Sequence, residues 1–366
     1  MYGRASSAST AITIESCTYE SSVVPTGPIA TRRLADDKVS ENNVLDRRLS
    51  VAPMMDWTDR HCRYFLRLFS PRVRLYTEMI VANAVLRGDR ERLLACDAAE
   101  HPVVLQLGGC DPRMLADAAA IGESFGYDEI NLNVGCPSDR VQNATFGACL
   151  MAQPRLVGDC VRAMRGAVGV PVTVKCRIGI DDRDDYPFLQ AFIAEMREAG
   201  CAAVIVHARK AMLRGLNPKE NREVPPLQYE RAWRVKSDFP SLTVIVNGGL
   251  RIVPQVTEQL RHVDGVMLGR EAYHNPYLLP ALHRAVYDDG FETPDPGWIV
   301  ARMQSYAERE VMRGTPLRAI TRHMLGLFAG RAGARAWRRA LGEGASRPGA
   351  SPALLTAALR AATRIP

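Results

Sequence analysis

The feature that most constrains this fold is an alternation of short apolar runs with amphipathic stretches between residues 49 and 270. The runs are LSVAPMM (49–55), VRLYTEM (73–79), PVVLQLGG (102–109), YDEINLNVG (127–135), PVTVKCRIG (171–179), AAVIVHAR (202–209), LTVIVNGG (242–249) and DGVMLGR (264–270). Stretches with helical spacing lie between them, for example at 111–126, 154–169 and 185–200. Strands that alternate with helices form a parallel sheet. Eight units in about 220 residues predict a (β/α)₈ TIM barrel.

The alternative is a doubly wound open sheet. Such a sheet places a glycine-rich phosphate loop directly after its first strand. Residues 52–57, which follow the first apolar run, contain no glycine. The barrel is therefore the preferred fold class.

The 366-residue chain divides into four regions by composition. Residues 1–47 are rich in Ser, Thr and Ala without apolar periodicity, which predicts a disordered extension or a start codon placed too early. Residues 48–296 hold the barrel, and 297–345 show helical spacing and predict a small helical domain. Residues 346–366 are expected to be a frayed tail. No apolar run approaches the roughly 20 residues needed to span a bilayer, so a membrane protein is not expected.

The positive charge is concentrated at the C-terminal end. The chain carries a net charge of +7, but residues 301–366 alone hold twelve arginines against three acidic residues. A solvated helical face or an unstructured tail could account for this charge. A more specific interpretation is a binding surface for a polyanion, of which a nucleic acid is the first candidate.

The nine cysteines are dispersed and odd in number. They form no CxxC pair and no Cys/His cluster with the spacing of metal ligands, so no metal site is expected. Single cysteines in a chain of this size are typical of a reducing compartment, which predicts a cytoplasmic protein.

Two strand ends predict a phosphate site. The seventh strand ends in Asn247, Gly248 and Gly249, and the eighth in Gly269 and Arg270. In TIM barrels the loops after these strands commonly bind phosphate through backbone N–H groups. Each glycine alone is better explained as a turn, but the two matching positions together favour a phosphorylated ligand.

Other strand ends would face the same barrel mouth. They carry Gln106, Lys175, Arg177 and His207, which suit FMN because an amide can bind flavin N5 or O4 and a cation stabilises the reduced flavin near N1. An internal ion pair or a hydrogen-bonded core histidine would explain Lys175 or His207 singly. The run 52–54 could contact a flat ring system or fill the barrel floor.

Cys136 lies where the fourth strand enters a long polar loop. An ordinary thiol is mostly protonated at neutral pH, so Cys136 could act as a general acid. It could equally act as a nucleophile if a neighbour lowered its pKa. Cys149, among small apolar neighbours, is expected to serve packing.

The chain resembles the tRNA-dihydrouridine synthases, most closely their A-type bacterial subgroup, from about residue 49 to 343. Its most specific pieces are APMMDWTDRHCR (52–63), NLNVGCPSDRVQNATFGACLM (131–151), HARKAMLRGLNPKENREVPPL (207–227) and RHMLGLFAGRAGARAWRR (322–339). These long signatures are far more specific than a short motif.

The resemblance implies reduction of uridine to 5,6-dihydrouridine at positions 20 and 20a of the tRNA D-loop, with FMN as cofactor and NADPH as reductant. It implies hydride transfer from flavin N5 to uracil C6 and a proton from Cys136 to C5. The flavin would be held by residues that match the family's, namely Ala52, Pro53, Met54, Gln106, Lys175, His207, Asn247, Gly248, Gly249, Gly269 and Arg270. The tRNA contacts would fall on Asn133, Lys219, Arg222, Arg335 and Arg338. No stable protein partner is expected, and the protein is predicted to be a monomer.

Two other functions were weighed. A flavin barrel acting on a free pyrimidine needs no basic helical appendage, so the charge of residues 301–366 argues against it. A non-catalytic RNA-binding protein on a degenerate barrel is disfavoured by the complete set of flavin and acid positions.

Overall fold

The computed structural model describes residues 46–138, 142, 145–288 and 290–364. These residues belong to one compact unit, Leu45–Pro366, and the second unit is Met1–Val44. Apart from Asp46 and Arg47, the predicted extension 1–47 lies outside the described residues. Arg47 already belongs to the barrel, because its guanidinium forms an ion pair of 2.8 Å with Glu129.

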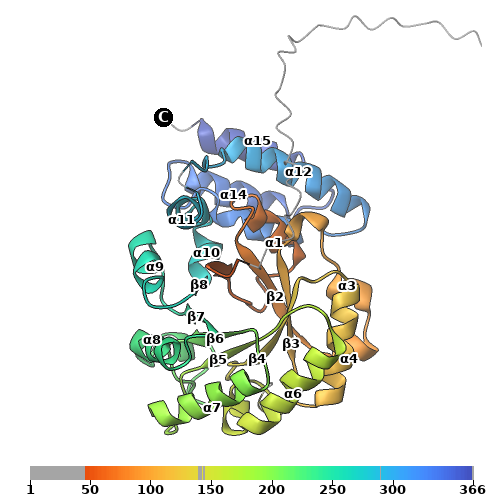
Figure 1. Ribbon diagram of the computed structural model, residues 1–366. Helices are drawn as coiled ribbons and strands as arrows, with labels where there is room; N and C mark the ends of the chain where they lie inside the picture. Colours follow the sequence, from red (N-terminus) through yellow and green to blue (C-terminus); the bar gives the residue numbers. More distant parts are fainter. Residues whose placement is uncertain (1–45, 139–141, 143–144, 289, 365–366) are drawn as a thin grey trace, which may run out of the picture. The chain divides into compact units, whose positions relative to one another are not determined.

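Eight parallel strands form a closed barrel in chain order, with β8 paired to β1 (Figure 1). The strands are β1 (Leu49–Val51), β2 (Arg74–Val81), β3 (Val103–Gly108), β4 (Glu129–Val134), β5 (Val172–Arg177), β6 (Ala203–His207), β7 (Thr243–Asn247) and β8 (Gly265–Leu268). Each coincides with one of the eight apolar runs. The predicted TIM barrel is confirmed.

Helices surround the strands as crossover connections (Figure 1). They are α1 (Arg60–Arg67), α2 (Ala82–Arg87), α3 (Arg90–Leu94), α4 (Pro112–Ser124), α6 (Pro154–Ala167), α7 (Tyr186–Glu198), α8 (Tyr229–Asp238), α9 (Val253–Gln259), α10 (Arg270–His274) and α11 (Leu278–Val286). Short 3₁₀ helices are η1 (Ala98–Glu100), η2 (Gly147–Ala152) and η3 (Glu220–Arg222). The apolar faces of the helices and the outward side chains of the strands form the main core.

The barrel interior has a second, smaller core. Its apolar members are Ala52, Tyr76, Val104, Ala203, Ile205, Ile245 and Met267. Successive side chains of a strand face opposite sides, so on β4 the apolar Ile130 and Leu132 belong to the outer core. Asn131 lies between them in sequence and bonds to side chains of β3 and β5. At the carboxyl ends of the strands, the positions that face inward are occupied by polar residues, and these residues surround the barrel mouth.

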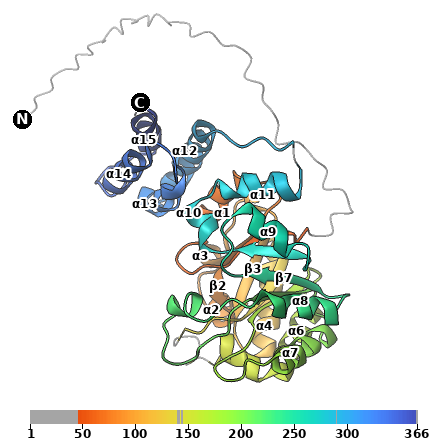
Figure 2. The ribbon, with the colours of Figure 1, turned by 90° about the vertical axis from the view of Figure 1, so that its left-hand side faces the viewer.

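The C-terminal region is helical, as expected. It comprises α12 (Pro296–Met312), α13 (Leu317–Thr321), η4 (Arg322–Gly326), α14 (Ala334–Gly344) and α15 (Leu354–Thr363). Figure 2 shows α12, α14 and α15 packed side by side. Among the described residues, no helix is both long and apolar enough to cross a membrane.

Helix α15 corrects the expectation that residues 346–366 form a frayed tail. Leu355, Ala358 and Ala362 are buried at helical spacing against the neighbouring helices. The Thr356 hydroxyl donates a 2.6 Å hydrogen bond to Gln304 of α12. Short helices have marginal stability in isolation, even when they are rich in alanine. This segment therefore depends on its packing against neighbouring helices.

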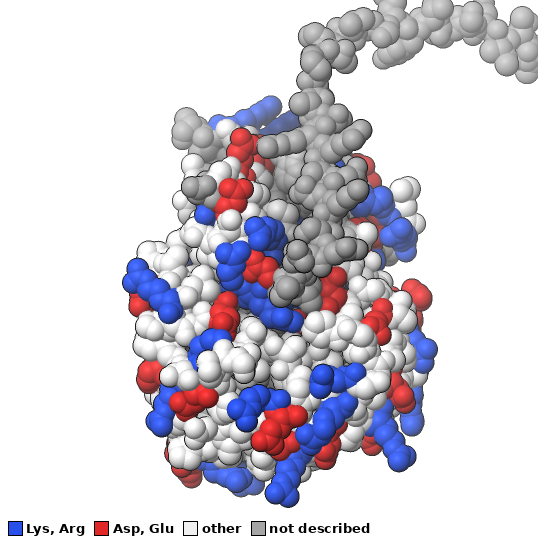
Figure 3. Space-filling model, viewed as in Figure 1, with Lys and Arg blue, Asp and Glu red and all other residues white. Residues whose placement is uncertain are grey.

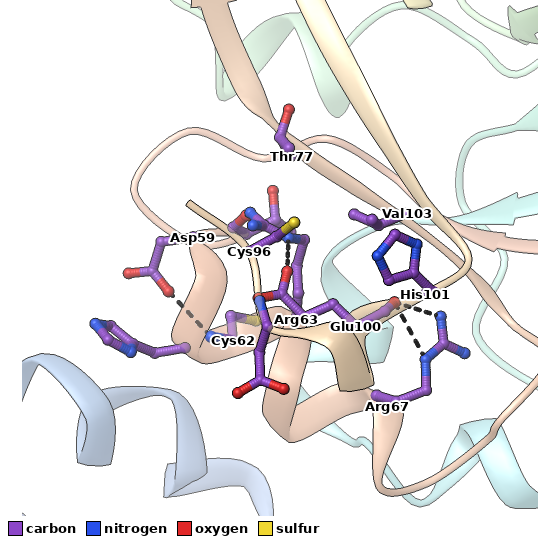
Figure 4. Close-up of polar contacts among 12 residues, drawn as sticks. Asp59, Cys62, Arg63, Arg67, Thr77, Cys96, Glu100, His101 and Val103 are labelled. Atoms are coloured by element: carbon purple, nitrogen blue, oxygen red, sulfur yellow. Dashed lines mark hydrogen bonds and ion pairs between the residues drawn. The ribbon is translucent and has the colours of Figure 1, made fainter. Parts of the chain in front are cut away.

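Asp59 connects the barrel to the helical region. It is the N-cap of α1 and accepts a 3.0 Å hydrogen bond from the Cys62 N–H (Figure 4). Its other carboxylate oxygen lies 2.8 Å from Arg322 and 3.0 Å from His323 of η4. Although burial opposes it, bonding to His323 and Arg322 holds the pKa of Asp59 well below its usual value. One carboxylate therefore caps a barrel helix and binds the C-terminal region.

Further contacts fix α1 on both sides. Tyr306 of α12 stacks on Tyr64, with ring centroids 4.0 Å apart, and its hydroxyl lies 2.7 Å from His61. On the barrel side, Arg63 forms a buried 2.6 Å ion pair with Glu100, whose carbonyl accepts from Arg67 (Figure 4). Helix α1 therefore contacts the barrel on one side and the C-terminal helical region on the other.

Candidate active site

The polar residues predicted at the strand ends converge on the carboxyl end of the barrel. Neighbouring strands pair Asn133 with Lys175, Arg177 with His207, and His207 with Asn247. Lys175 donates a 3.1 Å hydrogen bond to the side-chain oxygen of Asn247. These side chains therefore lie at adjacent positions around one mouth, as the strand ends predict.

Cys136 is held by its backbone at the edge of this mouth. The side-chain oxygen of Asn133 accepts from the N–H groups of Gly135 at 3.1 Å and Cys136 at 3.0 Å. The Cys136 carbonyl accepts from Ala148 at 2.9 Å, and the Gly135 carbonyl accepts from Arg177 at 3.0 Å. The thiol is half-buried in a segment fixed from both β4 and β5.

Cationic side chains lie at the mouth, where Arg177 is buried and Lys175 is partly buried. Burial, reinforced by Arg177, lowers the pKa of Lys175 to about 7. Burial lowers the pKa of Arg177 to about 9, and Cys136 opposes that shift. Burial, together with Arg177 and Lys175, holds the pKa of His207 well below its usual value. Positive charge crowded in a largely desolvated site favours an anionic ligand.

The glycines after β7 fit closely against this group. Gly248 and Gly249 have φ angles of 122° and 70°, a region that favours glycine. A Cβ at Gly248 would lie 3.0 Å from the His207 ring, so this glycine lets the loop pass over the imidazole. The Gly248 carbonyl accepts a 2.5 Å hydrogen bond from Tyr229.

The loop after β8 is more open. A Cβ at Gly269 would meet no atom within 4 Å. Arg270 forms a 2.6 Å ion pair with Glu223 from the loop after β6, and both side chains are partly exposed. The Nε of Arg209, in the same region, is buried and has no hydrogen-bond partner. An open glycine and an unpartnered guanidinium N–H are both features that accept a phosphate oxygen.

The segment after β1 forms a tight turn beside the mouth. The Ala52 N–H donates to the Leu268 carbonyl at 2.7 Å, which ties the turn to β8. The Thr58 hydroxyl accepts from the Met54 N–H at 3.0 Å and lies 3.2 Å from its carbonyl. Pro53 and Met54 are half-buried. Ala52 is buried in the barrel interior, and a contact of this turn with a ring system stays a prediction.

Comparison with known proteins identifies the family. Residues 50–363 match the model of the family described as Dihydrouridine synthase (Dus). The chain belongs to the dihydrouridine synthase family.

Several curated relatives carry the name tRNA-dihydrouridine(20/20a) synthase. The protein of Salmonella typhimurium is 56% identical over 86% of this chain and 94% of its own length. That of Xanthomonas campestris is 57% identical over 83% of this chain and 90% of its own length. The Escherichia coli K12 protein is 56% identical over 86% of this chain and 91% of its own length. Among solved structures, morphinone reductase aligns with a TM-score of 0.48 and 12% identity, covering 69% of this chain and 88% of its own.

Dihydrouridine synthases are FMN-dependent oxidoreductases, so this chain is a flavoenzyme. The mouth fits that cofactor. Arg209 offers a buried, unpartnered N–H, Gly269 leaves open space, and Lys175 supplies a cation that burial alone makes unfavourable. A bound phosphate would accept a hydrogen bond from the Arg209 N–H, and a flavin ring that gains negative charge on reduction would stabilise the Lys175 cation. The individual assignments of flavin contacts stay predictions.

The residues that the resemblance assigns to RNA binding lie in two places. Asn133 is at the mouth, and Lys219 and Arg222 are exposed in the loop after β6. Arg335 and Arg338 are exposed on α14, whose opposite face buries Trp337. Within the part of the chain that the structure describes, neither arginine forms an ion pair. They are therefore available to phosphates.

The charge distribution differs between the two regions. On the face of the molecule shown in Figure 3, Lys and Arg are interspersed with Asp and Glu over the barrel. Of the twelve C-terminal arginines, ion pairs with other described residues form only at Arg309, Arg313 and Arg322. The described residues also contain no group of three or more His, Cys, Asp and Glu placed to hold a metal ion.

Sequence reasoning left three residues out of the predicted site. Arg209 follows His207 by two positions and carries the unpartnered N–H. Asn131 and Thr173 are fully buried inside the barrel, two positions before Asn133 and Lys175 on their strands. Their signal was present, because polar residues at alternate positions of an apolar strand must face partners inside the barrel.

Proposed function

We propose that this chain reduces uridine to 5,6-dihydrouridine in tRNA, at positions 20 and 20a of the D-loop, with NADPH as reductant. The observation that carries the proposal is the fixed position of the half-buried Cys136 beside the buried Arg177 and the partly buried Lys175. The names of relatives that cover 86% of the chain support the substrate and the positions.

In this proposal Cys136 donates the proton to uracil C5 as general acid. FMN, when bound, supplies the hydride for C6. The Asn133 and Arg177 hydrogen bonds hold the thiol at the edge of the mouth. The nearby positive charges of Arg177 and Lys175 compensate the negative charge left on sulfur when the proton leaves. A proton from solvent then converts the thiolate back to the thiol, and the net change is addition of one hydride and one proton across the C5–C6 bond.

In this proposal the residues of the mouth hold the cofactor. We assign the phosphate end to Asn247, Gly248, Gly249, Gly269 and Arg270, and the ring to the 52–54 turn, Gln106, Lys175 and His207. Because its pKa is low, His207 is neutral at neutral pH and offers one donor and one acceptor. Burial lowers the pKa of Lys175 to about 7, and an anion bound beside it would raise that pKa and favour the charged form.

The helical region positions the RNA. The target base must leave its stack to reach a barrel mouth, which is easiest in a single-stranded loop. Arg335 and Arg338 would contact phosphates, and such contacts position a nucleic acid without reading its bases. The monomeric state and the cytoplasmic location remain predictions.

The test is to map dihydrouridine in tRNA from a strain lacking this gene. We expect uridine instead of dihydrouridine at positions 20 and 20a, restored by the wild-type gene and not by Cys136→Ala. Unchanged modification in the deletion strain, or full restoration by Cys136→Ala, would contradict the proposal. A protein acting on free pyrimidine would leave tRNA unaffected.

A further inference from the structure

A continuous line of hydrogen-bonded side chains runs inside the barrel from the Cys136 loop toward its amino end. Asn133 donates from Nδ2 to Gln106 Oε1 at 2.8 Å, and Gln106 donates from Nε2 to Asn131 Oδ1 at 2.7 Å. Asn131 donates from Nδ2 to the Thr173 hydroxyl at 2.9 Å, and Thr173 donates to Glu129 at 2.8 Å. We call this line the interior relay.

The two ends of the interior relay impose one direction on it. At one end the N–H groups of Gly135 and Cys136 can only donate, and they bind Asn133 Oδ1. At the other end the Glu129 carboxylate can only accept. Every amide and hydroxyl between them must therefore accept from the mouth side and donate toward Glu129. Flipping one amide would set two donors or two acceptors face to face.

Burial makes such a mismatch costly. Glu129, Asn131 and Thr173 are fully buried, and Gln106 is 1% exposed. A buried polar group without a partner loses its hydration without replacement, whereas water at the surface would repair the mismatch. The Thr173 hydroxyl has one proton and two neighbouring acceptors, but the Ile130 carbonyl is 3.5 Å away and the charged carboxylate is closer.

The Glu129 end is itself anchored. Its carboxylate pairs with Arg47 at 2.8 Å and lies 3.5 Å from Arg74, and it accepts from the Tyr76 hydroxyl at 3.3 Å. The Arg47 ion pair and the Tyr76 hydroxyl both place donors on this carboxylate, so it serves as the acceptor at this end of the interior relay. The direction of the relay is thus fixed at a point far from the mouth.

We propose that Asn131 and Thr173, anchored on Glu129, are positioning residues that orient the amides of Gln106 and Asn133 and so fix the backbone of Cys136. The inference rests on the proposed function, in which Cys136 is the acid. It assigns a role in the reaction to residues that touch neither the thiol nor the mouth.

The experiment compares Thr173→Val with Thr173→Ser in the flavin-loaded full-length protein. Valine keeps the shape and removes the hydroxyl, whereas serine keeps the hydroxyl. We expect hydrogen exchange of the backbone amides in the segment containing Gly135 and Cys136 to rise about fivefold or more in Thr173→Val, the size of one lost hydrogen bond. Dihydrouridine formation at saturating tRNA should fall by a similar factor at unchanged KM. Thr173→Ser should restore both.

Ser50→Ala is the matched control. Ser50 is fully buried in β1, and the one hydrogen bond that its hydroxyl donates to a described residue goes to the Val266 carbonyl, at 3.4 Å, outside the relay. It should leave exchange at Cys136 and turnover unchanged. If Thr173→Val behaves like Ser50→Ala, or if Thr173→Ser is no better than Thr173→Val, the inference is overturned. Hydrogen exchange needs no tRNA, so it tests the relay even if the wild-type protein forms no dihydrouridine.

A second variant covers the case in which Thr173→Val does not fold. Asn131→Leu breaks the interior relay one group closer to Gln106 with a side chain of similar size. The same rise in exchange at Gly135 and Cys136 is expected, with flavin still bound. Unchanged exchange in a folded Asn131→Leu protein would refute the positioning role.

Discussion

Asn133 holds the backbone of Cys136 through a 3.0 Å hydrogen bond from the Cys136 N–H to the Asn133 side-chain oxygen. The two residues are three positions apart, so the bond closes a tight turn at the end of β4. Because the other side of the Asn133 amide is engaged by Gln106, the turn is attached to the barrel interior. The thiol is therefore placed by the barrel, although it lies in a loop.

Replacing Cys136 with alanine should separate cofactor binding from proton transfer. We expect flavin to stay bound and NADPH to reduce it as before, because the thiol contributes no cofactor contact in our assignment. Dihydrouridine formation should fall by about two to four orders of magnitude, the usual effect of losing a general acid. Flavin absorbance, stopped-flow reduction and product analysis on tRNA measure these steps separately. Wild-type turnover by the variant would remove Cys136 from the mechanism.

Lys175 should make the stability of the flavin-free protein depend on pH. Burial lowers its pKa to about 7 in the folded state, below the ordinary 10.5, so the unfolded chain binds the extra proton between these values. The free energy of unfolding contributed by Lys175 must then rise as pH increases from about 7 to 10. Lys175→Met lacks this titration. Thermal unfolding should show the free energy of unfolding of wild type increasing relative to that of Lys175→Met across this pH range. A difference between the two proteins that does not change with pH would contradict the lowered pKa.

Arg335 and Arg338 should bind tRNA through phosphates. We expect the double alanine variant to bind more weakly, and the slope of log affinity against log salt to become shallower by about 1.5. NADPH oxidation without tRNA should be unchanged. Arg197→Ala with Arg261→Ala removes the same charge near the carboxyl ends of α7 and α9, away from the mouth. If both double variants behave alike, α14 is not the tRNA-binding surface.

Asp59→Asn should test the connection between the barrel and the helical region. Asparagine can still cap α1, but it loses the charge that faces Arg322 and His323. We expect the free energy of unfolding to fall by about 1 to 3 kcal/mol near neutral pH.

The sign of the pH effect at Asp59 follows from its lowered pKa. The stabilisation is complete above the ordinary carboxyl pKa of about 4 and is lost as pH falls below it toward the folded-state pKa. Wild type and Asp59→Asn should therefore converge in acid. Denaturant unfolding at pH 7 and pH 3 measures this, and a difference that persists unchanged at pH 3 would contradict it.

The barrel and most of its mouth can be predicted from the amino-acid pattern alone. A strand shows its inner face through alternation and its carboxyl end through the residues that follow, so Gln106, Lys175, His207 and Asn247 could be placed from local pattern alone. In a closed parallel barrel all these ends meet, and the fold class then implied one common site.

Which distant groups become partners depends on how the chain packs in three dimensions. Nothing local connects Glu129 to Thr173, Asp59 to Arg322, or Arg270 to Glu223, because their distances depend on strand register and on how loops return to the barrel. Helix α15 was missed although its alanines and leucines favour a helix, because a helix of 10 residues is marginal alone and depends here on packing against neighbouring helices. Local sequence specifies which face each residue occupies, whereas packing specifies what it meets there.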